Sequence, residues 1–147
     1  HLTVKFLGFT PESDISTLSN DLDAIAKANS PFDLSISGTG CFPNENKPSV
    51  LFLGVSGNRN ALSKLVKDTE ALMTDRGYPK LENDYFPHIT IARIKYPQKF
   101  SPDITSFLNS SYDSIDFRVN RLQFFSSEIL PEGVFYNLLG TFPLADI

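Results

Sequence analysis

The chain has 147 residues, of which 41% are hydrophobic and 20% are charged, a composition typical of one folded domain and not of a disordered chain. No stretch approaches the ~18 consecutive apolar residues that a membrane span requires. The formal charge of −4 argues against a protein that wraps a long nucleic-acid backbone, because such proteins carry a broad basic surface.

Predicted strands and helices alternate along the first two thirds of the chain. Residues 1–9 alternate and are rich in β-formers, which predicts a strand. Thr10 and Pro11 are typical of a helix start, and apolar residues at helical spacing then predict a helix to about Ala28. The same criteria predict two strands, a second helix closed by Gly77 and a further strand, at residues 32–42, 50–56, 58–77 and 88–94.

The last third of the chain predicts a short helix and two long strands. The helix is expected at residues 102–108, and the strands at 116–129 and 134–143, joined by a turn at Pro131-Glu132-Gly133. Strands joined by hairpin-length loops pair antiparallel, whereas the helices lie between strands in the sequence. We therefore predict an α+β fold with antiparallel or mixed sheets and outer helices.

A short pattern occurs twice, at residues 1–4 and 88–91, as His-Leu-Thr-Val and His-Ile-Thr-Ile. Two further pairs of landmarks recur at nearly the same offset. They are Phe32-Asp33-Leu34 with Phe117-Arg118-Val119, and Leu53-Gly54 with Leu139-Gly140. The constant offset predicts that residues 1–147 form a single domain with two similar, pseudo-symmetric lobes.

The repeated pattern joins the only two histidines of the chain to a threonine two positions later. Side chains two apart on a strand point the same way, so each strand presents histidine and threonine on one face. Imidazole, with a reference pKa near ~6.5, can accept or donate a proton, and threonine can donate to phosphate oxygens. Across a cleft between lobes, His1 and His88 would form an acid–base pair that hydrolyses a strained phosphodiester, with Thr3 and Thr90 on the phosphate.

The same residues also have ordinary structural interpretations. A single histidine on a strand is more often structural than catalytic, and threonine is a common strand residue. A metal site is disfavoured, because there is no third histidine and Asp84 has no ligand-like spacing to His88. Aromatic side chains could stack a base, although core packing accounts for most of them: Phe9, Phe42, Phe124, Phe125 and Tyr136.

Several cations could make the cleft locally basic despite the negative chain. They are Lys5, Arg93, Lys95, Lys99, Arg118 and Arg121. For the lysines a solvated strand edge is the favoured interpretation. Arg93 lies at an odd offset from His88, so it can share that face only through a bulge or at a strand end.

HLTVKFLG and, much later, FPHITIAR resemble the two His-x-Thr-x motifs of the 2H phosphoesterase superfamily. PFDLSISGTGCFPN, SVLFLGV and the tail LQFFSSEILPEG with VFYNLLGTFPL resemble its RNA 2′,3′-cyclic phosphodiesterase branch, also called the 2′-5′ RNA ligase family. The resemblance implies a bilobal, LigT-like α+β fold around a central groove. It also implies hydrolysis of terminal 2′,3′-cyclic phosphates to 2′-phosphates without metal or cofactor.

The resemblance to this family also implies a separate role for each site residue. His1 would be the proton donor, His88 the proton acceptor, Thr3 and Thr90 the phosphate ligands, and Arg93 a basic position after the second motif. Expected partners are RNA ends with a 2′,3′-cyclic phosphate or small cyclic nucleotides, with no membrane, and we expect a monomer. Relatives carry a strand and a helix before the first motif, so we expect that this N-terminal part is missing.

Two alternatives stay open at this point. One is a non-catalytic module that binds RNA ends or nucleotides. The other is a different 2H reaction, such as 2′-5′ RNA ligation or cleavage, or ADP-ribose 1″,2″-cyclic phosphate hydrolysis. The single Cys41 and the absence of a secretion signal predict a cytoplasmic location.

Overall fold

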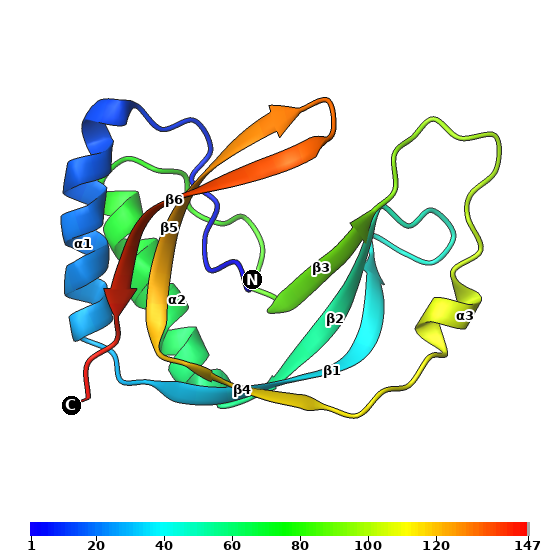
Figure 1. Cartoon of the computed structure of the whole chain (residues 1–147), viewed down its shortest axis with the longest axis horizontal. Helices are drawn as coiled ribbons and strands as arrows, with labels where there is room; N and C mark the ends of the chain where they lie inside the picture. Colours follow the sequence, from blue (N-terminus) through cyan, green and yellow to red (C-terminus); the bar gives the residue numbers. More distant parts are fainter. Residues whose placement is uncertain (147) are drawn as a thin grey trace. The chain divides into compact units, whose positions relative to one another are not determined.

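The computed structural model describes residues 1–146 and divides into two compact units. The first unit comprises residues 1–4, 33–59 and 83–117. The second comprises residues 5–32 and 60–82 and the chain from residue 118 onward. The strands pair antiparallel and the helices lie before or between them in the chain (Figure 1), which confirms the predicted α+β class.

A four-stranded sheet with the order β3-β2-β1-β4 carries the first unit (Figure 1). β2 pairs antiparallel with β1 on one side and with β3 on the other. Thr39 of β1 donates a hydrogen bond to the carbonyls of Phe107 and Leu108, which attaches the short helix α3 to this sheet. The elements are β1 (Phe32–Phe42), β2 (Val50–Gly57), β3 (His88–Arg93), α3 (Thr105–Leu108) and β4 (Ile115–Val119).

The second unit combines two longer helices with a two-stranded antiparallel sheet. The helix α1 buries one apolar stripe, Leu18, Leu22, Ile25 and Ala26, and packs against β5 and β6. The helix α2 buries a similar stripe, consisting of Leu62, Leu65, Val66 and Met73 together with Thr69. The elements are η1 (Glu12–Asp14), α1 (Ile15–Lys27), α2 (Arg59–Asp75), β5 (Arg121–Leu130) and β6 (Gly133–Pro143).

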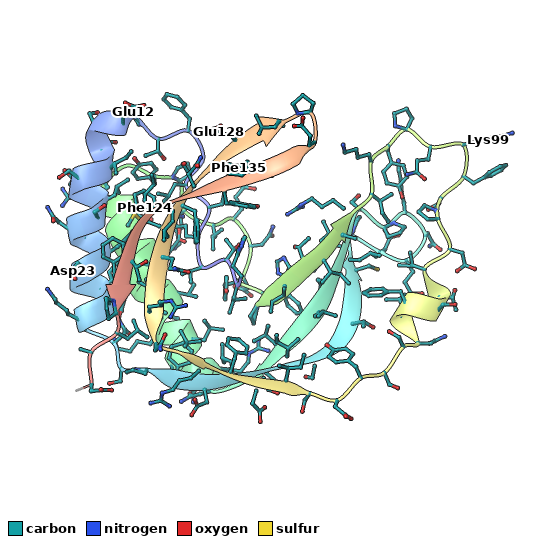
Figure 2. The ribbon with its side chains drawn as sticks, viewed as in Figure 1. Glu12, Asp23, Lys99, Phe124, Glu128 and Phe135 are labelled. Carbon is teal, nitrogen blue, oxygen red and sulfur yellow. The ribbon has the colours of Figure 1, made fainter. Side chains whose placement is uncertain are left out.

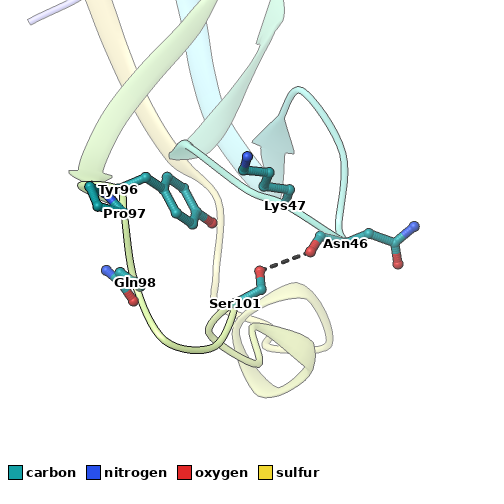
Figure 3. Close-up of a pocket in the computed structure, with 6 residues that line it drawn as sticks. All are labelled: Asn46, Lys47, Tyr96, Pro97, Gln98 and Ser101. Atoms are coloured by element: carbon teal, nitrogen blue, oxygen red, sulfur yellow. Dashed lines mark hydrogen bonds between the residues drawn. The ribbon is translucent and has the colours of Figure 1, made fainter.

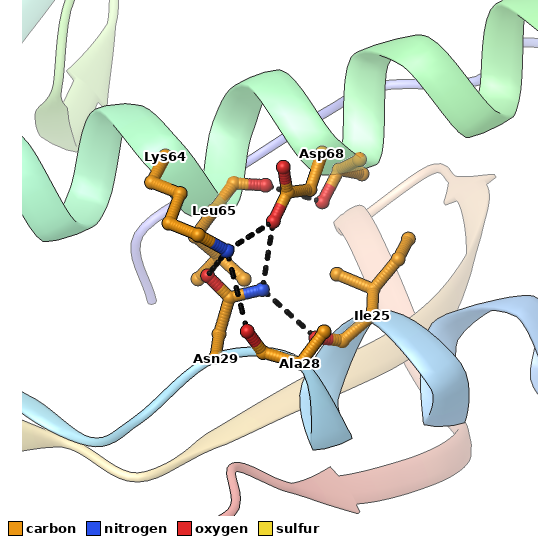
Figure 4. Close-up of polar contacts among 7 residues, drawn as sticks. Ile25, Ala28, Asn29, Lys64, Leu65 and Asp68 are labelled. Atoms are coloured by element: carbon orange, nitrogen blue, oxygen red, sulfur yellow. Dashed lines mark hydrogen bonds and ion pairs between the residues drawn. The ribbon is translucent and has the colours of Figure 1, made fainter. Parts of the chain in front are cut away.

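A polar network joins the end of α1 to α2 (Figure 4). The buried amide of Asn29 donates to the carbonyl of Ile25 and to Asp68, and it accepts from the ammonium group of Lys64. Lys64 also donates to Asp68 and to the carbonyl of Ala28. Every polar atom of the Asn29 side chain thus has a partner, which offsets the cost of its burial.

The sheet of the second unit becomes exposed toward its turn. Phe124 near the start of β5 is 9% exposed, whereas Ile129 is 89% and Phe135 is 55% exposed. Figure 2 labels Phe135 and its cross-strand partner Glu128 on this ribbon. The helices therefore cover only one end of the strand pair.

The predicted strand over residues 1–9 is wrong. No residue of this segment belongs to a strand ladder among the described residues. Its alternation is nonetheless visible in burial, because His1 and Thr3 are exposed while Leu2 and Val4 are half-buried. A strand requires a paired neighbour for its backbone groups, and alternation alone does not supply one.

Two smaller predictions also differ from the structure. Thr10 does not cap a helix: its hydroxyl donates to the carbonyl of Gly8, and the first turn after it is the 3₁₀ helix η1. The long strand predicted at 116–129 divides into β4 and β5, which belong to different sheets and meet at Asn120. The carbonyl of Asn120 accepts a hydrogen bond from the backbone of Leu144.

The twofold relation between the two halves stays a prediction.

Candidate active site

The strand β3 presents the second His-x-Thr motif on one face. In the antiparallel register His88 lies opposite Gly54 and Thr90 lies opposite Phe52, which are two residues apart on β2. Ile89, opposite Leu53, points to the other face. His88 and Thr90 therefore share a face, as predicted, and both are half-buried.

A β-bulge in β3 returns Arg93 to this same face. Thr90 pairs with Phe52, but the next pair is Ala92 with Leu51, so Ile91 is the extra residue. Arg93 then lies opposite Val50, two positions from Phe52. The odd offset of Arg93 from His88 is thus cancelled, and its exposed side chain extends the face that carries the two motif side chains.

The imidazole of His88 has a defined orientation. Its Nδ1 lies 2.8 Å from the carbonyl oxygen of Phe86. A carbonyl oxygen can only accept a hydrogen bond, so Nδ1 carries the proton in this contact. In the neutral imidazole Nε2 then holds the lone pair, and it is the nitrogen that can accept a proton from a reacting group.

Three phenylalanines surround that imidazole. The ring centroids of Phe42 and Phe52 lie 5.0 and 5.4 Å from that of His88, both at steep interplanar angles, and Phe86 lies 6.4 Å away. Phe42 and Phe52 also stack on each other at 4.4 Å. Gly40 permits this packing, because a Cβ atom there would lie 2.4 Å from the Phe52 ring. Phe42 is therefore one of the rings that enclose the imidazole, and this packing restricts the rotation of the His88 side chain.

The first motif lies in the same unit as β3, although it is not a strand. The hydroxyl of Tyr85 donates a hydrogen bond of 2.7 Å to the carbonyl of Thr3. Tyr85 precedes β3 by three residues, and Figure 1 draws the N-terminus beside the His88 end of that strand. Tyr85 and Phe86 are not evident as site residues in the sequence: the partner of Tyr85 is 82 positions away, and the contact of Phe86 is made by its backbone carbonyl, which any residue carries.

The other predicted cations have different surroundings. Lys5 is not at a solvated strand edge: its side chain is 4% exposed, and it contacts both carboxylate oxygens of Glu70, at 2.9 and 3.0 Å, and the carbonyl of Pro79. Burial alone would raise the pKa of Glu70, but hydrogen bonds from Lys5 and the Leu81 backbone hold that pKa below its usual value. Solvent-exposed positions are found for Lys95, Lys99, Arg118 and Arg121. Figure 2 shows the Lys99 side chain pointing outward from its loop.

A pocket of about 460 Å³ lies between two loops of the first unit (Figure 3). It is lined by Asn46, Lys47, Tyr96, Pro97, Gln98 and Ser101. Ser101 donates to the carbonyl of Asn46, and the Lys47 ammonium lies 5.3 Å from the centre of the Tyr96 ring. None of the five predicted site residues lines this pocket.

Within residues 1–146 no three His, Cys, Asp or Glu side chains come together in a way that could hold a metal ion. In the same residues no helix combines the length and the apolar character needed to cross a bilayer.

The chain has a LigT-like α+β fold. The protein TT0787 of Thermus thermophilus matches with a TM-score of 0.73 and 28% identity, over 98% of this chain and 77% of that protein. The fold also matches E. coli LigT, solved with 3′-AMP, with a TM-score of 0.75 and 19% identity over 99% of this chain and 77% of LigT.

Residues 1–128 match the model of the 2′-5′ RNA ligase superfamily. The RNA 2′,3′-cyclic phosphodiesterase of Aquifex aeolicus strain VF5 is 32% identical over 98% of this chain and 77% of that protein. This chain belongs to the 2′-5′ RNA ligase superfamily, which confirms the family that the two motifs indicate.

Proposed function

We propose that this chain is an RNA 2′,3′-cyclic phosphodiesterase, a phosphoric diester hydrolase that converts 2′,3′-cyclic phosphates at RNA ends or in small cyclic nucleotides to 2′-phosphates. Membership of the superfamily and the similarity to the A. aeolicus enzyme of that name support the activity. The observation that carries the assignment is the contact between His88 Nδ1 and the Phe86 carbonyl, which leaves Nε2 as a proton acceptor.

The proposed reaction uses the two motifs in separate roles. His88 Nε2 takes a proton from water, which attacks phosphorus, while the bond from phosphorus to the 3′ oxygen breaks. His1 gives its proton to that departing oxygen, so the products are a 2′-phosphate and a free 3′-hydroxyl. Thr3 and Thr90 donate to the non-bridging oxygens, whose negative charge grows in the transition state.

Product analysis tests the proposed function. We expect the protein to open a panel of nucleoside 2′,3′-cyclic phosphates and RNA with a cyclic end, and to form 2′-phosphates in every case. We also expect turnover to survive dialysis against EDTA. Liquid chromatography with authentic 2′- and 3′-phosphate standards separates the products. Binding of cyclic nucleotides without turnover would instead indicate a non-catalytic module, and 3′-phosphate products would contradict the proposed bond cleavage.

Arg93 is proposed to bind the phosphate or the adjoining RNA backbone, because the bulge in β3 places it on the face of His88 and Thr90. A charge-assisted hydrogen bond contributes about 1.5–3 kcal/mol, and the exposure of Arg93 favours the lower value. We therefore expect Arg93→Gln to raise KM about tenfold, with a smaller change in kcat, as measured by steady-state kinetics. Lys99→Gln, on an exposed loop, is the matched control. Equal KM values in both variants would remove Arg93 from the site.

The substrates are free RNA ends and small cyclic nucleotides rather than long duplexes, because the formal charge of −4 provides no broad basic surface. The protein acts as a cytoplasmic monomer, and the single Cys41 supports the location through its compatibility with a reducing compartment.

A further inference from the structure

We propose that Tyr85 is a positioning residue for the first motif, and that it acts on His1 and Thr3 through the hydrogen bond from its hydroxyl to the Thr3 carbonyl. The bond is 2.7 Å long, and its two residues belong to the same unit although 82 positions separate them in the chain. The proposal rests on the proposed function, because it assigns Tyr85 a part in placing the proton donor of that reaction.

No sheet orders the first motif, so a side-chain hydrogen bond to its backbone contributes to its placement. His88 and Thr90 are held by ladder pairs with β2, whereas residues 1–4 lie outside every ladder among the described residues. The Thr3 carbonyl lies in the middle of the motif, next to the side chain that would bind phosphate and two residues from His1. A hydrogen bond at this carbonyl restricts the backbone of both functional residues.

Tyr85 is suited to a permanent donor role. Burial raises the pKa of its phenol to about 12, and the positive charge of Arg59 only partly opposes that increase. The hydroxyl therefore stays protonated throughout the neutral range. Since a carbonyl can only accept, the direction of the bond does not change with pH in that range.

The residues after Tyr85 act on the second motif. Phe86 offers its carbonyl to His88 Nδ1, and the buried Pro87 between them has a fixed φ angle. The segment Tyr85–His88 thus contacts one motif through a side chain and the other through its backbone. This segment therefore fixes the position of His1 relative to His88. A sheet cannot do so, because the first motif is not in a strand.

The test is Tyr85→Phe, which removes the hydroxyl and keeps the ring. We expect kcat for a 2′,3′-cyclic nucleotide to fall on the order of tenfold, because small displacements of a reacting group are costly, while KM stays within about twofold. Tyr112→Phe is the matched control, since it deletes a phenol-to-carbonyl bond of 2.6 Å to Gly38 in the same unit. Assays are run below the melting midpoints of both variants, so that a loss of folding does not enter the comparison.

A double-mutant cycle separates positioning from general destabilisation. In a His1→Ala background, Tyr85→Phe should lower kcat by a clearly smaller factor than in the wild-type background, because the proton donor is already absent and only the effect on Thr3 is left. Multiplicative losses in the double variant, or an unchanged kcat in Tyr85→Phe alone, would overturn the proposal. Either result leaves the proposed function intact if the wild-type protein forms 2′-phosphates, whereas an inactive wild-type protein would contradict the function itself.

Discussion

Replacing His88 with alanine lowers kcat for a 2′,3′-cyclic nucleotide by about 10²–10⁴-fold, the usual contribution of a positioned acid or base. The side chain is half-buried among Phe42, Phe52 and Phe86, whose rings offer no proton acceptor to replace its Nε2. Steady-state kinetics with product quantification measures the loss.

Asp84→Asn is the matched control for this variant. Asp84 is exposed and lies four residues before His88, outside the proposed site, so its substitution should leave kcat unchanged. The double variant of His88 and His1 should lose less than the product of the two single losses, because the two groups serve one step. Full activity in His88→Ala would end the acid–base hypothesis.

Lys5→Met should lower the free energy of unfolding by about 1–3 kcal/mol, because it leaves the shielded Glu70 carboxylate with only the hydrogen bond from the Leu81 backbone. Both side chains are shielded, with 4% and 14% exposure. Lys27→Met is the matched control: its pair with Asp23 is 69% and 41% exposed, and we expect a change of about 0–1 kcal/mol. Urea unfolding followed by circular dichroism measures both variants.

The loss of unfolding free energy in Lys5→Met should become smaller as the pH falls. The pKa of Glu70 is lowered in the folded protein, so its ionised form stabilises the fold above the unfolded pKa, about 4.3 for glutamate. That contribution disappears as pH falls through the folded pKa. The difference between wild type and Lys5→Met should therefore shrink in acid, and a constant difference from neutral pH down to full protonation would contradict it. A Lys5→Met, Glu70→Met double variant should recover most of the stability.

Local sequence patterns were sufficient to predict most of the helices and strands. Apolar spacing predicted the two long helices, now α1 and α2, and alternation predicted the strands β1, β2 and β3 close to their observed bounds. The shared face of His88 and Thr90 also followed from alternation, because a two-residue period is a property of any strand. These predictions succeed because they depend on neighbours within a few residues.

Predictions failed or stayed conditional where the partner is distant in the chain. Alternation in residues 1–9 cannot show whether a ladder exists beside them, and the charge of Lys5 cannot indicate a partner 65 residues away. The face of Arg93 depends on a bulge, and a bulge is defined by the register between two strands.

The amino-acid sequence by itself determined the α+β class and the two His-x-Thr motifs, through periodicity and a short repeat, and it indicated the family through the resemblance of those motifs. Only the tertiary structure decided which nitrogen of His88 is free, that Arg93 joins its face, that Lys5 is buried against Glu70, and that Tyr85 holds the Thr3 carbonyl. The physical reason is that hydrogen bonds, ion pairs and strand register depend on groups that folding brings together. These groups are distant in the chain, so the sequence around one of them does not show which partner it has.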